Sequence, residues 1–114
     1  PREGILRLLA KGISLDAVVC YNDQIAMQII PALASRGARV PEDISVTGYD
    51  NSYMAMGDGF RLTTIVHPQE KLGEMAAQLL LSLLQGEILQ PEERKILIQP
   101  ELVVGNSCHT TAPK

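Results

Sequence analysis

Three short apolar runs in this chain each end on a polar or ionisable residue. The runs cover residues 17–21, 44–49 and 62–66, and the residues that follow them are Asn22, Asp50 and His67. Runs of this length that are rich in β-branched residues are typical of buried strands. If the three strands are parallel neighbours, the three polar residues emerge at the same edge of one sheet.

The segments around these runs carry the three- and four-residue spacing of amphipathic helices. Helices are predicted over 3–12, from Asn22-Asp23 to Gly37, and from Pro68 to Gly86, with Glu70 placed as a capping-box acid. Short strands are predicted at 95–99 and 102–104, a helical turn at 53–56, and a mobile tail without pattern at 106–114. This order predicts an α/β fold, a parallel sheet flanked by helices on both faces.

Composition narrows the class of protein. The chain has 114 residues, of which 46% are hydrophobic and 20% charged, with a net charge of −3. This allows one small core, and it disfavours a nucleic-acid-binding surface on this segment because phosphate binding needs clustered Lys and Arg. No apolar run approaches the roughly 20 residues that span a bilayer. The start on Pro1 in a helical pattern, without a signal peptide, suggests an excised fragment.

The two cysteines, Cys20 and Cys108, are far apart and form no Cys-x-x-Cys pair. A disulfide framework is therefore not indicated, and a reducing cytosol is the simpler setting. Cys20 is expected to be a small core residue.

The strand-end residues are the candidates for binding chemistry, because open α/β sheets hold ligands beyond the carboxyl ends of their strands. The Asp50 carboxylate and the Asn22 amide suit sugar hydroxyls. Structural alternatives remain at this point. Asn22-Asp23 could be a helix cap, Asp50 an Asx-turn, and His67 the end of a strand.

Other chemistry finds little support in the sequence. The chain has no Walker or Gly-x-Gly-x-x-Gly sequence, and its His and Cys residues lack zinc-ligand spacing. No cofactor, no metal site and no catalytic residue is predicted. An acid/base pair of Asp50 and His67 is the remaining enzymatic alternative.

Four stretches resemble a known family. Residues 17–26, 39–50 (RVPEDISVTGYD) and 62–65, and the ending at 100–108, are similar to the effector-binding domain of lactose/galactose-repressor-type transcription regulators. The resemblance covers nearly the whole chain. Within the family, the YNDQ sequence and His67-Pro68 are most like the arabinose repressors, which carry a winged-helix DNA-binding head.

The resemblance implies a two-lobed, periplasmic-binding-protein-like fold. Residues 1–105 would be part of the carboxyl-terminal lobe, serving effector binding and dimerisation, and 106–114 a tail. The amino-terminal lobe and the DNA-binding domain are absent from this chain. By position, Asn22, Asp50 and His67 fall where such regulators bind the effector, although the lactose repressor has Gln in place of His67.

Dimerisation in this family uses the helix after Asn22-Asp23 and the loop after Asp50. The resemblance thus makes Met27, Ile30, Tyr53, Met54 and Met56 candidates for the dimer interface. The apolar cluster at 53–56 has local core packing as its alternative.

Three functions follow as hypotheses. The first is a sugar-sensing fragment of a cytoplasmic repressor that forms a homodimer and reaches operator DNA only through its absent head, with arabinose a candidate effector. The second is a periplasmic sugar-binding receptor of the same fold, and the third is a small α/β enzyme. The residues that precede Pro1 in the intact protein would separate the first two.

Overall fold

The computed structural model describes residues 1–52, 56, 57 and 59–109. Contacts within the chain divide it into two compact units. The first unit contains Pro1–Val66 and Leu102–Lys114, and the second contains His67–Glu101. No helix among the described residues is long and apolar enough to cross a membrane.

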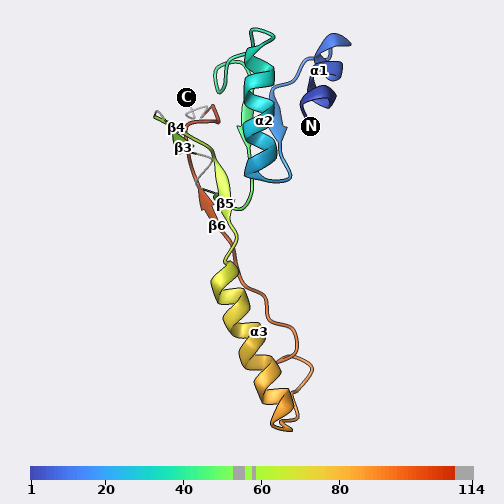
Figure 1. Cartoon of the computed structure of the whole chain (residues 1–114), viewed down its shortest axis with the longest axis vertical. Coiled ribbons are helices and arrows are strands. Elements are labelled where there is room, and N and C mark those ends of the chain that lie inside the picture. The colour runs from blue at the N-terminus through green and yellow to red at the C-terminus, as the bar shows by residue number, and fades with distance from the viewer. Residues whose placement is uncertain (53–55, 58, 110–114) are drawn as a thin grey trace, which may run out of the picture. The chain divides into compact units, whose positions relative to one another are not determined.

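The first unit is an α/β arrangement built on short strands (Figure 1). Along the chain it contains α1 (Arg2–Ala10), β1 (Ala17–Val19), α2 (Asp23–Ala34), β2 (Ser45–Thr47), β3 (Met56–Gly57), β4 (Phe60–Arg61) and β5 (Thr64–Val66). The last strand, β6 (Glu101–Val103), pairs with β5, and β3 and β4 form an antiparallel pair.

β1, β2 and Thr63, the residue just before β5, follow one another as parallel neighbours. Val18 of β1 faces Val46 of β2 in parallel register, and Thr47 makes a parallel bridge to Thr63. Beyond the strand ends, the Gly48 N–H donates to the Thr63 carbonyl at 3.0 Å. The parallel sheet predicted from the three apolar runs is therefore confirmed.

One face of this sheet is buried and the other is open. Cys20, Val46 and Leu62 are nearly inaccessible and form a core with α2, whose Ala26 and Leu33 are fully buried. On the opposite face Val19 is 84% exposed and Tyr21 85% exposed. α1 packs against α2. Within this unit, α2 packs on the buried face of the sheet.

The residues after β6 are fixed by hydrogen bonds, contrary to the expectation of a tail without pattern from residue 106. Ser107 is fully buried, its Oγ donates to the Val46 carbonyl at 2.6 Å, and that Oγ accepts from the Thr63 N–H at 2.8 Å. Asn106 exchanges two backbone-directed bonds with Arg61, each 2.7 Å long. The mobile tail was thus a wrong prediction for residues 106–109.

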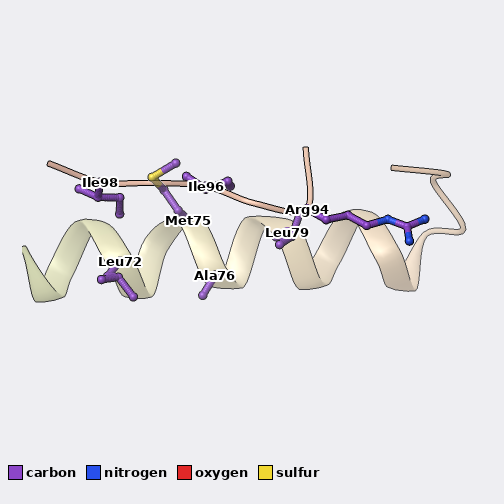
Figure 2. Close-up of a pocket in the computed structure, with 7 residues that line it drawn as sticks. All are labelled: Leu72, Met75, Ala76, Leu79, Arg94, Ile96 and Ile98. Atoms are coloured by element: carbon purple, nitrogen blue, oxygen red, sulfur yellow. The ribbon is translucent and has the colours of Figure 1, made fainter. Parts of the chain in front are cut away.

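The second unit contains α3 (Gln69–Leu84) and an extended segment that runs beside it (Figure 2). α3 has no buried residue, and its amino end at Pro68 has no side-chain cap, so the capping box predicted with Glu70 is wrong. Residues 95–99 do not form the predicted strand. Four α3 side chains and three from the segment line an apolar pocket of about 190 Å³: Leu72, Met75, Ala76, Leu79, Arg94, Ile96 and Ile98.

The predicted helical turn at 53–56 is only partly testable. Residues 53–55 lie outside the described part of the chain, and Met56 belongs to β3. A helical turn that includes Met56 is therefore wrong.

Candidate functional site

The carboxyl ends of β1 and β2 meet at one edge of the sheet. The N–H of Asp23, which follows β1, donates to the Tyr49 carbonyl at 2.9 Å. The N–H of Asp50, which follows β2, donates to the Ile65 carbonyl at 2.9 Å. These bonds continue the ladder past the strands, so the residues that leave each strand are next to each other. Asn22 and Asp50 are thereby brought to the same edge, as the sequence predicted.

Asn22 is the N-cap of α2. Its backbone is extended, with φ −153° and ψ 175°, and its Oδ1 accepts the Ile25 N–H at 2.9 Å. This bond satisfies one of the amides that a helix start leaves without an intrahelical partner. The cap engages Oδ1, so the Nδ2 amide can donate to a ligand while the helix stays capped.

Asp50 lies at the start of a constrained loop. Asp50 is exposed and has a φ of 96°, and the next residue, Asn51, has a φ of 51°. Non-glycine residues rarely adopt positive φ, and two in succession require support from their surroundings. The sequence places Asp50 correctly but gives no sign of this conformation.

His67 is the first residue of the second unit and follows Val66 of β5 directly. It is half-buried, and its carbonyl accepts the Gln69 N–H at 2.8 Å. Its placement beside Asn22 and Asp50 stays a prediction that rests on its position in the chain.

Asp23 is the residue of this edge that sequence reasoning missed. It is fully buried, and its carboxylate accepts from Thr64 Oγ1 at 2.5 Å and from the Ser52 N–H at 2.7 Å. A Cβ at Gly48 would collide with the Asp23 Oδ1, so only glycine allows this approach. The Gly48-Tyr49-Asp50 sequence was the available signal, because a glycine beside a strand end indicates a close contact.

An apolar pocket of about 210 Å³ lies on this sheet. It is lined by residues of the three parallel segments and by one of β6: Val19, Cys20, Tyr21, Thr47, Gly48, Tyr49, Thr63, Thr64, Ile65 and Leu102. Burial raises the pKa of the Cys20 thiol, which keeps it protonated and chemically inert at neutral pH. Cys20 is thus the small core residue that was expected.

Of the proposed interface residues, two can be placed on α2. Met27 and Ile30 are both half-buried. Met56 lies in β3, and Tyr53 and Met54 fall outside the described residues. Within the described part of the chain, no group of three or more His, Cys, Asp or Glu residues is arranged to hold a metal ion.

Residues 4–108 match the model of the periplasmic binding protein-like domain. The chain is 38% identical over 93 residues to the arabinose metabolism transcriptional repressor of Halalkalibacterium halodurans, covering 79% of this chain and 25% of that protein. It is 40% identical over 91 residues to the HTH-type transcriptional repressor PurR of Vibrio campbellii, covering 80% of this chain and 27% of that protein. The chain thus spans about a quarter of the length of these relatives.

Solved structures of transcriptional regulators are also similar to this chain. The lac repressor dimer bound to operator and the anti-inducer ONPF superposes with a TM-score of 0.82 at 31% identity, over 95% of this chain and 37% of that chain. The complex of the transcriptional regulator CelR with cellobiose has a TM-score of 0.81 at 30% identity, over 93% of this chain and 32% of that one. The similarity therefore extends over nearly all of this chain and about a third of each solved chain.

Proposed function

Because this chain belongs to the family of periplasmic binding protein-like domains, we propose that it is the effector-binding fragment of a bacterial transcriptional repressor. The observation that carries the proposal is the shared sheet edge, where Asn22 and Asp50 follow neighbouring parallel strands. Ligands of open α/β folds bind at this edge. We infer that the effector is a sugar, because similar regulators have been solved in complex with cellobiose and with lactose and because the edge offers hydrogen-bonding side chains.

In this proposal each side chain has a distinct task. The Asp50 carboxylate accepts hydrogen bonds from two hydroxyls of the sugar, which orients a neutral polyol through charge-assisted bonds. Asn22 donates from Nδ2 while its Oδ1 stays on α2, and His67 contributes a ring nitrogen. Arabinose is the first candidate, because two relatives are named as repressors of arabinose metabolism.

The length of the relatives and the apolar surface of each unit support the fragment part of the proposal. Taken by itself, the first unit exposes Val19 and Tyr21 on its sheet, and the second exposes Leu80 (57%) and Leu84 (75%) on α3. Contiguous apolar surface of this kind is rare on free soluble domains. The relatives are about four times longer than the matched part, which supports the proposal that this chain is a fragment of a longer protein.

Regulation would follow from the position of α2. The helix starts at Asn22, at the ligand edge, and carries Met27 and Ile30, two of the proposed interface residues. Met56, Tyr53 and Met54 would extend the interface through the loop after Asp50. A sugar that binds one arrangement of the lobes more tightly shifts the dimer toward that arrangement. This shift would change the DNA affinity of the DNA-binding domains, which lie outside this chain.

A periplasmic sugar receptor is the second candidate on this fold. The relatives named above are repressors, which favours the regulator and, with it, a cytoplasmic location and no enzymatic role. Sedimentation of the intact protein separates the two, because the repressor is expected to be a dimer and a transport receptor a monomer.

The test of the proposed function is a calorimetric titration of the intact protein with a panel of pentoses and hexoses. One sugar is expected to bind and to change the affinity of the protein for its operator. Binding of none of the sugars would overturn the sugar proposal. Turnover of any of them would restore the enzyme hypothesis.

A further inference from the structure

We propose that Asp23, together with Thr64, is a positioning residue that presents Asp50 to the sugar without touching the sugar itself. The inference rests on the proposed function of this edge. It starts from a contrast between two neighbouring acids, since Asp23 is fully buried and Asp50 is exposed. An acid with no exposed surface cannot contact a ligand directly, so any influence it has on binding must pass through other residues.

The loop that carries Asp50 needs external support. Asp50 and Asn51 both have positive φ, and the buried Asn51 Oδ1 has no hydrogen-bond partner among the described residues. Both features cost free energy and would favour a different loop conformation if nothing opposed it. The loop therefore keeps this shape because its backbone is held elsewhere.

Three successive backbone N–H groups form the hydrogen bonds that keep the loop in this shape. The Asp50 N–H donates to the Ile65 carbonyl at 2.9 Å, and the Asn51 N–H reaches Thr64 Oγ1 at 3.4 Å. The Ser52 N–H donates to Asp23 Oδ2 at 2.7 Å. Two of these three acceptors belong to the pair formed by Asp23 and Thr64, whose own bond is 2.5 Å long.

The pair is also anchored on the side away from the loop. Asp23 is the first residue of α2, where the helix dipole favours a carboxylate, and its N–H donates to the Tyr49 carbonyl. Gly48 gives the carboxylate room, because any Cβ there would collide with Asp23 Oδ1. The Asp23 backbone ties α2 to the end of β2, and its side chain ties α2 to the Asp50 loop and to β5, so a change of this side chain should move Asp50.

The test uses three variants of the intact protein and measures sugar affinity by calorimetry. Asp23→Ala removes the acceptor for Ser52 and should weaken sugar binding by about tenfold or more, as expected for loss of hydrogen bonds to a charged group. Asp23→Asn is the conservative variant. Its amide oxygen can accept from Ser52 and its NH₂ can donate to the Thr64 hydroxyl, so affinity should stay within about threefold of the original.

Thr64→Val is the third variant and keeps the shape of a residue that is 1% exposed. It removes the bond to Asp23 and the acceptor of the Asn51 N–H, and it should weaken sugar binding by about threefold to tenfold. If Asp23→Ala does not unfold cooperatively, the sugar affinity of Thr64→Val tests whether the Asp23–Thr64 pair positions Asp50. Hydrogen exchange of the Ser52 amide, measured without sugar, should accelerate in Asp23→Ala and stay slow in Asp23→Asn.

A purely structural role for Asp23 gives a different result. It would lower the melting temperature of Asp23→Ala and leave the sugar affinity of the folded protein unchanged, which would overturn the inference. Failure of the original protein to bind any sugar would instead overturn the proposed function. In that case the Ser52 exchange rate in Asp23→Ala still tests whether Asp23 fixes the Asp50 loop. An unchanged rate would refute this part of the inference, and a faster rate would support it.

Discussion

Helices α2 and α3 have similar amphipathic sequences and opposite surroundings. α2 buries Ala26, Ile29, Ala32 and Leu33 against the sheet, whereas α3 buries none of its residues. Leu33 is inaccessible, while Leu80 is 57% exposed. The difference teaches that helical periodicity identifies the face a helix will bury but not the element that buries it. For α2 that element lies in its own unit, and for α3 we expect it outside the second unit.

The largest expected effect separates the two helices directly. Leu33→Ala should lower the free energy of unfolding by about 2–5 kcal/mol, because it removes a fully buried side chain and leaves a cavity. The loss should appear both in this 114-residue chain and in the intact protein. Urea unfolding of the two proteins measures it, and a loss confined to the intact protein would show that α2 is not part of an independent core.

The matched change on α3 is Leu80→Ala. Within the second unit the side chain is exposed. In the intact protein the change should cost about 1–3 kcal/mol, because we expect an element outside that unit to cover the α3 face. Urea unfolding measures the cost, and a negligible cost in the intact protein would contradict the expectation that the α3 face is covered.

A third change separates the two roles proposed for Asn22. Asn22→Ala should cost about 1 kcal/mol, because the Ile25 amide loses its cap. Asn22→Ser keeps an oxygen for the cap and lacks the Nδ2 amide, so stability should be retained while sugar affinity falls. Thermal melts and calorimetry of the intact protein read the two effects independently. Full sugar affinity in Asn22→Ser would reduce Asn22 to a cap alone.

The smallest effect concerns the surface of the first unit. The Arg39 guanidinium donates two bonds of 2.9 Å to Asp43, the Arg39 N–H adds a third of 2.8 Å, and these lower the pKa of Asp43 to about 2. A folded pKa below the ordinary value of about 3.9 means that the stabilisation is present above that pH and is lost as the pH falls toward 2. NMR titration should find the pKa of Asp43 raised toward its ordinary value in Arg39→Ala. An unchanged pKa would remove Arg39 as the cause.

The sequence predicted the parts of the fold that depend on local pattern. The three parallel strands and the meeting of Asn22 with Asp50 at one edge followed from apolar runs that end on polar residues. The buried face of α2 followed from its spacing. These features are readable because each is encoded within a few consecutive residues.

The features that were missed depend on single residues far apart in the chain. Ser107 bonds Val46 across 61 positions, and Asp23 bonds Thr64 across 41, so neither contact leaves a periodic signal. The predicted strand at 95–99 failed for a related reason, because a strand forms only where a neighbouring strand can pair with it. Sequence analysis recognised Asn22 as a candidate ligand and Asn22-Asp23 as a helix cap, but nothing in the sequence indicated that Asp23 would be buried.

The central claim is that the Asp50 edge binds the effector, and one calorimetric comparison tests it most directly. Asp50→Asn keeps the shape and tolerates positive φ but removes the charge, whereas Asp16→Asn makes the same change at an exposed residue next to the amino end of β1. The intact protein should lose at least about tenfold in sugar affinity with Asp50→Asn and almost none with Asp16→Asn. Unchanged affinity in Asp50→Asn would contradict the account.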